Sequence, residues 1–238
     1  MKFRLPCALF LAAALSASPA LARAKLKPVV AAPVVQLSAV VDPDPSHGSE
    51  NVLVLDLSNG GRVLIRLMPA WAPAHVERVK TLAAQGFYNG LKFHRVIDGF
   101  MAQTGDPTGT GGGGSPLPNL KAEFNYMPHV RGAVSMARTD EPDTANSQFF
   151  IVFYPRFALD HHYTNFGRVI AGMDMVDVIE RGEPPSNPTR IAQASLYSEH
   201  KPAPPPAPVI APPALEPAPA PLAVAAPVAA PVRKTKKH

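Results

Sequence analysis

KFHRVIDGFMAQTGD, residues 92–106, places a guanidinium, large apolar side chains and a carboxamide within a few positions of one another. Asp98 and Gly99 in its middle form a turn signal, so the stretch predicts two short extended segments joined by a turn. If Arg95 and Gln103 project to the same side as the apolar residues between them, they form an apolar cup with planar hydrogen-bonding groups at its rim. Such a cup suits a neutral, ring-shaped guest.

Two further blocks follow in the chain, RGAVSMARTDEPDTANSQFFIVF at residues 131–153 and LDHHYTNFGRVIAG at residues 159–172. The three blocks in this order resemble the cyclophilin family of peptidyl-prolyl cis-trans isomerases. The resemblance covers about residues 50–198 and does not extend to either end of the chain. It implies a β-barrel fold, isomerase activity, and X-Pro segments of unfolded or flexible proteins as partners.

The composition divides the chain of 238 residues into three parts. Hydrophobic residues make up 46% of the chain, which is enough for one good core. Most glycines, phenylalanines and charged residues lie within residues 50–200, whereas both flanks are rich in Ala, Val and Pro. We therefore expect one globular domain at residues 50–200, between a Pro-containing linker (residues 23–49) and a disordered Pro/Ala-rich tail (residues 201–238).

Residues 1–22 have the pattern of a targeting segment. Lys2 and Arg4 precede an apolar run at residues 5–15, and Ala20-Leu21-Ala22 ends the segment. A positive start, a short apolar middle and a small-residue ending predict a secretory signal peptide that is cut after Ala22. We therefore predict a periplasmic or secreted protein. The alternative is a protein anchored in the inner membrane by an uncleaved N-terminus, although the apolar run is short for a bilayer.

The formal net charge of +5 comes from the ends of the chain. Residues 50–200 contain 13 Lys plus Arg and 15 Asp plus Glu, so the domain carries a net charge of −2. Nucleic-acid binding by the domain therefore lacks an electrostatic basis, and no nucleic-acid partner is expected. The tail ends in RKTKKH, residues 233–238, which predicts weak contact with an anionic envelope surface.

Alternating apolar residues predict about eight short strands, two of them in the opening stretch. Residues 51–58 and 62–68 alternate on either side of the turn signal Asn59-Gly60-Gly61 and predict a hairpin. Two helices are expected, from Pro73 to Gly86 and over residues 173–180. From this pattern we predict a mainly β protein, a closed eight-stranded antiparallel β-barrel capped by two α-helices. The other predicted strands are residues 132–138, 148–153, 165–170 and 190–198, the last with Ile191, Gln193 and Ser195 on one face.

The chemistry of an X-Pro bond makes Arg95 the candidate catalytic residue. Rotation must break amide conjugation across a barrier of about 18–20 kcal/mol, so it takes about tens to hundreds of seconds unaided. At half rotation the prolyl nitrogen regains its lone pair, and a donor aimed at that nitrogen binds the twisted state better than either planar state. A guanidinium stays charged and planar, and the resemblance assigns Arg95 this same role. The alternative is an ordinary surface arginine on a strand.

The resemblance also implies a set of substrate-binding residues. Because neighbours on a strand face opposite sides, only one of an adjacent pair can face the groove, so we expect Phe149 in the core and Phe150 in the pocket. For the apolar members the alternative is ordinary core, and for the carboxamides it is an exposed surface. The set comprises the pocket residues Phe100, Met101, Phe150 and Leu159, the carboxamides Gln103 and Gln148, and the strand edge at Ala137 and Arg138.

Two positions depart from the better-known eukaryotic members of the family. Where those members carry a histidine four residues after the pocket leucine, this chain has Tyr163. A phenol can pack on a proline ring and donate a hydrogen bond, so we predict Tyr163 as a further substrate-binding residue. Where they carry a tryptophan directly before that leucine, this chain has Ala158, so affinity for cyclosporin-type inhibitors does not follow from the resemblance.

No metal ion or other cofactor is expected. Cys7, the only cysteine, leaves with the predicted signal peptide. The adjacent His161 and His162, with His129 far off in the sequence, lack metal-ligand spacing. The glycine-rich residues 105–119 lack the Lys-Ser/Thr pair of a phosphate-binding loop.

Two hypotheses of different classes share the predicted groove. The first is an exported isomerase that assists the folding of proteins outside the cytoplasm. The second is a binding module that holds X-Pro segments as a chaperone or scaffold. We expect a monomer in either case.

Overall fold

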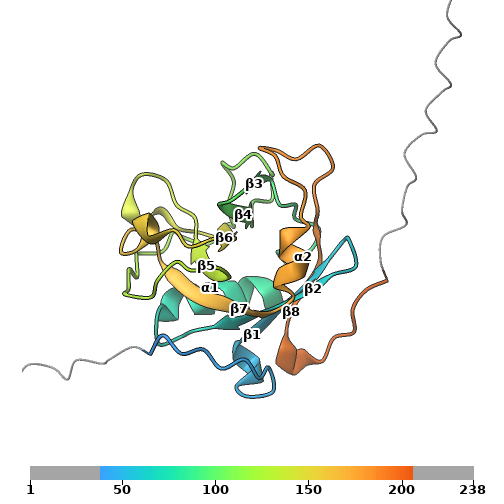
Figure 1. The fold of residues 1–238 in the computed structure, drawn as a ribbon, viewed down its shortest axis with the longest axis horizontal. Coiled ribbons are helices and arrows are strands. Elements are labelled where there is room, and N and C mark those ends of the chain that lie inside the picture. The colour runs from blue at the N-terminus through green and yellow to red at the C-terminus, as the bar shows by residue number, and fades with distance from the viewer. Residues whose placement is uncertain (1–37, 206–238) are drawn as a thin grey trace, which may run out of the picture. The chain divides into compact units, whose positions relative to one another are not determined.

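The computed structural model describes residues 38–205. The eight strands within these residues belong to one antiparallel sheet, in the order β3-β4-β6-β5-β7-β2-β1-β8 (Figure 1). In the described part of the chain, two α-helices accompany the sheet, α1 (Pro73–Ala84) and α2 (Met173–Asp177). The strands are β1 (Val52–Leu57), β2 (Arg62–Leu67), β3 (Arg95–Ile97), β4 (Met101–Thr104), β5 (Ala133–Met136), β6 (Phe149–Val152), β7 (Asn165–Ala171) and β8 (Ile191–Leu196). Single helical turns lie at Ser49–Asn51, Pro142–Thr144, Phe157–Leu159 and Tyr197–Glu199.

The sheet is curled into a half-barrel that does not close. In Figure 1, β3, β4 and β6 lie at one side of the curl, and β1, β2 and β8 lie at the other. The edge strands β3 and β8 share no ladder. The chain before β3 meets the start of β8 through an isolated bridge at Lys92 and Arg190 and through backbone hydrogen bonds of 2.7 to 2.9 Å between residues 90–93 and 189–191. The predicted closed barrel is therefore wrong. Residues 91–94 contain one isolated bridge residue and no strand, so their contacts with residues 189–191 do not form a continuous ladder between β3 and β8.

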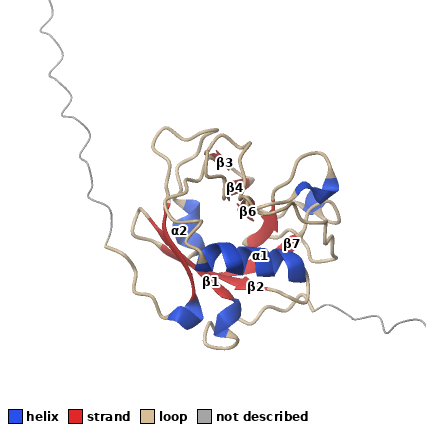
Figure 2. Ribbon diagram, turned by 180° about the vertical axis from the view of Figure 1, so that it is seen from behind, coloured by secondary structure: helices blue, strands red, loops and turns tan. Residues whose placement is uncertain are grey.

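The predicted hairpin and first helix are confirmed. In β1, Leu53 and Leu55 belong to the main core cluster, and Gly60 adopts φ 84° in the turn to β2. Pro73 occupies the first turn of α1, where the backbone nitrogen needs no partner within the helix. Figure 2 shows α1 crossing the sheet, and it buries one face against the core through Val76, Val79, Leu82 and Ala83.

The last strand departs from its predicted alternation. Ile191 and Ala194 both belong to the main core cluster, although they are three positions apart. The register explains this, because Asp56 pairs with Gln193 but Leu57 pairs with Ile191, so Ala192 is an extra residue in the ladder. Such a bulge turns the side chains that follow it to the opposite face. Helix α2 is also shorter than predicted.

The domain begins before residue 50. Residues 38–49, predicted as part of a linker, lie against the sheet, and we call them the N-terminal segment. The indole Nε1 of buried Trp71 donates to the backbone oxygen of Ser38 at 3.0 Å. The guanidinium of buried Arg66 donates to the carbonyl oxygens of Asp42, Asp44, His47 and Gly48.

The linker prediction is therefore wrong for the N-terminal segment. At the other end, Pro202 accepts a hydrogen bond from Gln193, so the domain also extends slightly past residue 200. The predicted signal peptide at residues 1–22 and most of the predicted tail lie outside the described residues. Among residues 38–205, none of the helices has both the length and the apolar character that crossing a bilayer requires.

Candidate active site

A hollow of about 200 Å³ opens on the side of the half-barrel formed by β3, β4 and β6. Nine residues line it, and all nine belong to the predicted site. The tenth predicted residue, Gln148, lies next to this hollow and lines a neighbouring one. The nine lining residues are Arg95, Phe100, Met101, Gln103, Ala137, Arg138, Phe150, Leu159 and Tyr163. The structure therefore brings together the residues that the sequence predicts to act together.

Strand register brings the rim and the floor of the hollow together. Gln103 of β4 lies opposite Arg95 of β3 and opposite Phe150 of β6. Directly opposite residues of an antiparallel pair project to the same face, so the three side chains share one surface. As expected, Phe149 belongs to the main core cluster and Phe150 to the cluster under the hollow.

Phe100 and Met101 both line the hollow, as the predicted set has them, although strand alternation would allow only one of two neighbours to do so. Met101 is the first residue of β4, whereas Phe100 lies in the turn before it. Strand alternation does not apply to a turn residue, which explains the difference. The Arg156 guanidinium lies over the Phe100 ring, 5.2 Å from its centroid, and holds this wall from outside.

The Arg95 guanidinium is held from two sides at the edge of the hollow. Its Nε donates to Glu183 Oε2 at 2.7 Å, and its Nη1 lies 3.4 Å from Gln103 Oε1. The Arg95 side chain is 40% exposed, so a ligand can reach it. Because Nε faces the carboxylate, the Nη end of the fork is available to a group in the hollow.

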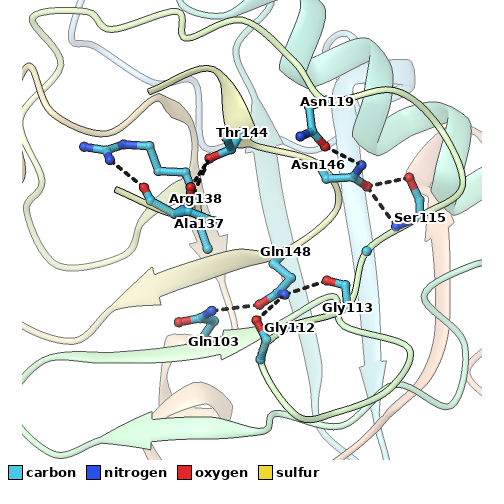
Figure 3. A pocket seen from close by; sticks show the side chains of 13 residues that line it. Gln103, Gly112, Gly113, Ser115, Asn119, Ala137, Arg138, Thr144, Asn146 and Gln148 are labelled. Carbon is cyan, nitrogen blue, oxygen red and sulfur yellow. Dashed lines mark hydrogen bonds between the residues drawn. The ribbon is translucent and has the colours of Figure 1, made fainter. Parts of the chain in front are cut away.

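The two carboxamides continue this chain of hydrogen bonds. Gln103 Nε2 donates to Gln148 Oε1 at 2.9 Å, and Gln148 Nε2 donates to the carbonyl oxygens of Gly111 and Gly113 at 2.9 and 2.7 Å. Figure 3 shows Gln148 between Gln103 and the glycine-rich loop, in a second hollow of about 380 Å³. The second hollow shares Gln103, Ala137 and Arg138 with the first, so an extended peptide could lie across both.

The Arg138 side chain braces the wall of the hollow. Its nitrogens donate to the carbonyl oxygens of Thr139, Asp140 and His162 at 2.7 to 3.0 Å. Its guanidinium carbon lies 4.6 Å from the centroid of the Tyr163 ring. The Tyr163 ring in turn meets the Phe150 ring edge-on, with 5.7 Å between centroids. Arg138 therefore fixes Tyr163 in the wall of the hollow. The nitrogens of Arg138 already donate to these backbone carbonyl oxygens.

The sequence interpretation missed a largely buried set of hydrogen-bonded polar residues beneath the hollow. His129 Nδ1 lies 2.7 Å from Asp160 Oδ1, and His129 Nε2 lies 2.7 Å from Ser135 Oγ. Burial lowers the pKa of His129, although Asp160 opposes the shift. Ser135 and His129 are almost fully buried, so Ser135 cannot act as a nucleophile on an external substrate. Because the His129 ring stacks against Phe150, these hydrogen-bonded residues support the floor of the hollow.

Asp106 organises the glycine-rich loop that borders the second hollow. Its carboxylate accepts hydrogen bonds from the backbone N–H groups of Thr108, Thr110 and Gly111 and from the Thr108 hydroxyl. Burial by itself would raise the pKa of Asp106, but the hydrogen bonds from Thr108, Gly111 and Gly113 together lower it to about 2, from an ordinary 3.8. The loop is therefore built around an ionised carboxylate.

This arrangement predicts a pH-dependent contribution to stability. Since the folded-state pKa lies below the ordinary value, the Asp106 carboxylate stabilises the fold above about pH 4, and this contribution is lost as the pH falls toward about 2. We expect Asp106→Asn to unfold at lower urea concentration than the wild type at neutral pH, and the difference to shrink below about pH 4. The matched control, Asp140→Asn, removes an exposed carboxylate. A difference that stays constant down to about pH 2 contradicts the prediction.

Comparisons with known proteins agree on one family. A family model described as cyclophilin type peptidyl-prolyl cis-trans isomerase/CLD matches residues 52–196. A probable peptidyl-prolyl cis-trans isomerase of Brucella suis is 43% identical over 183 residues, which cover 70% of this chain and 90% of the relative. A peptidyl-prolyl cis-trans isomerase of Helicobacter pylori is 44% identical over 130 residues, which cover 53% of this chain and 78% of the relative.

Solved structures give the same result. A cyclophilin from Hirschia baltica superposes with a TM-score of 0.59 and 30% identity, over 67% of this chain and 76% of that one. A Cryptosporidium parvum cyclophilin type isomerase, crystallised in the presence of the dipeptide Ala-Pro, superposes with a TM-score of 0.57 and 28% identity, over 61% and 98% of the two chains. The chain therefore belongs to the cyclophilin-type peptidyl-prolyl cis-trans isomerase family.

Proposed function

We propose that the hollow of about 200 Å³ holds the proline ring of an X-Pro segment while Arg95 stabilises the twisted amide. One observation carries this proposal: the guanidinium stands at the edge of a hollow with an apolar floor, and the residues that line the hollow include no carboxylate or imidazole. The isomerisation moves no proton and needs no covalent intermediate, so a donor and a ring-shaped apolar site are the parts it requires.

In the proposed mechanism each group of lining residues has its own role. Phe100, Met101, Phe150 and Leu159 bury the proline ring, and Tyr163 closes the site beside them. The twisted amide has a smaller dipole than the planar form, so an apolar surround favours it further. Arg95 donates to the prolyl nitrogen in that state, and Gln103 bonds the backbone beside it. An acceleration of about five decades needs about 7 kcal/mol in all, which one charged hydrogen bond in a dry site and a fixed ring can supply.

X-Pro segments are the substrates that this geometry suits best. The presence of Ala-Pro in crystals of the Cryptosporidium parvum relative supports this class of ligand. The test is the cis-trans exchange rate of a short Ala-Pro peptide with the wild-type chain, together with its binding affinity. Accelerated exchange supports the enzyme. A wild-type chain that binds the peptide without accelerating exchange supports the alternative of a chaperone or scaffold that only holds X-Pro segments.

We propose further that the protein acts outside the cytoplasm on the folding of exported proteins. The support is the pattern of the first 22 residues, namely a positive start, a short apolar run and a small-residue ending. Fractionation of producing cells and N-terminal sequencing test the proposal. We expect a protein in the periplasm or medium that begins at Arg23. A membrane-bound protein that retains Met1 supports the anchored alternative.

For the C-terminal end we propose weak contact with an anionic envelope surface through RKTKKH. The support for this contact is the cluster of basic residues at 233–238, next to a domain of slightly negative charge. For the whole chain we propose a monomeric state. Deleting residues 206–238 is expected to reduce co-sedimentation with anionic vesicles at low salt. Unchanged co-sedimentation contradicts the contact, and a sedimentation mass above that of one chain contradicts the monomer.

A further inference from the structure

Glu183 is paired with Arg95 by the backbone as well as by its side chain. Val96 and Gly182 form an antiparallel bridge and exchange two backbone hydrogen bonds of 2.8 Å. Residues on either side of such a bridge also lie opposite each other, so Glu183 is the cross-strand neighbour of Arg95. Gln103 is its neighbour on the other side. Arg95 thus stands between a carboxamide on β4 and a carboxylate on the segment after α2.

The segment that carries Glu183 is held in place independently of Arg95. Gly182 adopts φ 147°, and a Cβ atom there would lie 2.7 Å from the Cα of Pro185, so only glycine fits this position. The Glu180 carboxylate accepts hydrogen bonds from Ser186 Oγ and from the backbone of Asn187 at 2.6 and 3.1 Å. These contacts fix the backbone on both sides of Glu183. The carboxylate therefore meets Arg95 from a defined direction.

A carboxylate on Nε determines where the rest of the guanidinium points. The five N–H donors of arginine lie in one plane with fixed angles, so holding Nε–H and one Nη orients the whole fork. Within residues 38–205, Arg95 Nη2 has no hydrogen-bond partner. Glu183 itself does not line the hollow. The carboxylate thus lies outside the lining of the hollow and leaves the Nη end of the fork for the substrate.

We propose that Glu183 is a positioning residue for the isomerisation, and this inference rests on the proposed function. It holds the Arg95 fork in the orientation that meets the twisted amide. A contribution to stability is not its main effect, because the Arg95 and Glu183 side chains are 40% and 52% exposed, and exposed ion pairs stabilise proteins little. An arginine side chain has many rotamers in solution, and restricting them before the substrate binds lowers the barrier of the chemical step.

Two substitutions separate geometry from charge. Glu183→Ala removes the acceptor, and we expect kcat for an Ala-Pro peptide to fall about tenfold while KM changes less than about twofold. Glu183→Gln keeps an acceptor oxygen without the charge, and we expect kcat within about threefold of the wild type. The matched control is Asp98→Ala, which removes an exposed carboxylate that pairs with Arg181 on the same side of the domain. We expect the control to keep wild-type kcat.

Two further measurements make the test specific. The Arg95 Nε–H proton, observed by NMR, is expected to exchange slowly with water in the wild type and in Glu183→Gln, and quickly in Glu183→Ala. Adding Glu183→Ala to Arg95→Ala is expected to cause no further loss, because the carboxylate acts only through the guanidinium.

The proposal is overturned if Glu183→Ala keeps wild-type kcat, if Glu183→Gln is as impaired as Glu183→Ala, or if Asp98→Ala loses as much. In those cases the wild-type chain and Arg95→Ala still differ, so the proposed function stands. A wild-type chain without isomerase activity, or an Arg95→Ala variant that retains it, overturns the proposed function first and the role of Glu183 with it.

Discussion

Replacing Arg95 with alanine is expected to lower kcat/KM for an Ala-Pro peptide about a hundredfold, which corresponds to about 2.7 kcal/mol of transition-state stabilisation. Arg138, the other cation that lines the hollow, cannot substitute for it, because its nitrogens already donate to backbone carbonyls. The loss is expected mainly in kcat, since the apolar lining that binds the ring is unchanged. Exchange rates measured by NMR at several peptide concentrations give both constants.

Two variants control this experiment. Arg95→Lys keeps a positive charge but not the planar fork, so we expect activity between those of the wild type and Arg95→Ala. Arg131→Ala removes an arginine of similar exposure (43%) that pairs with Asp177, and wild-type activity is expected. Wild-type kcat/KM in Arg95→Ala would falsify the assignment of this residue as the donor. Equal losses in Arg95→Ala and Arg131→Ala would point to a general effect of charge.

Replacing Arg66 with alanine is expected to lower the free energy of unfolding by about 3 kcal/mol. Arg66 is only 6% exposed, and its guanidinium donates to four backbone carbonyls of the N-terminal segment. Without it, these oxygens lose charged donors, and the segment loses its main attachment to β2. Urea unfolding followed by fluorescence suits the test, because Trp71 is the only tryptophan and donates to Ser38 within the same segment.

The matched control is Arg168→Met. Arg168 lies directly opposite Arg66 in the sheet, and its buried Nε has no hydrogen-bond partner among the described residues. Burial also lowers its pKa. An arginine with an unsatisfied nitrogen contributes less than one with every donor occupied, so a much smaller loss is expected. A loss below about 0.5 kcal/mol in Arg66→Ala, or equal losses in both variants, contradicts the role of Arg66 as an anchor.

Short-range patterns were sufficient to predict most of the secondary structure. The hairpin of β1 and β2 follows from strict alternation around a glycine turn, and α1 follows from a proline start and a glycine stop. These signals depend on neighbours within a few residues, so the sequence displays them directly. The bulge at Ala192 was not predictable in this way, because it appears only when β8 pairs with β1.

The candidate site likewise contains residues that the sequence predicted and residues that it did not. The family resemblance, together with the chemistry of Tyr163, predicted the nine residues that the structure finds around one hollow. Glu183 was not among them, since it lies 88 positions from Arg95 and no periodic pattern connects the two. The largely buried, hydrogen-bonded set of His129, Ser135 and Asp160 was missed for the same reason. The one local clue to Glu183 was the glycine directly before it.

By itself, the sequence determined which segments become strands and helices, which family the domain resembles, and which side chains could meet a proline ring. Folding in three dimensions decided that the barrel stays open, that residues 38–49 belong to the domain, and that a carboxylate holds Arg95. The physical reason is the separation along the sequence between the residues that interact. Secondary structure responds to steric and hydrophobic patterns between near neighbours, whereas closure, anchoring and orientation depend on pairings between distant segments, which exist only once the chain is packed.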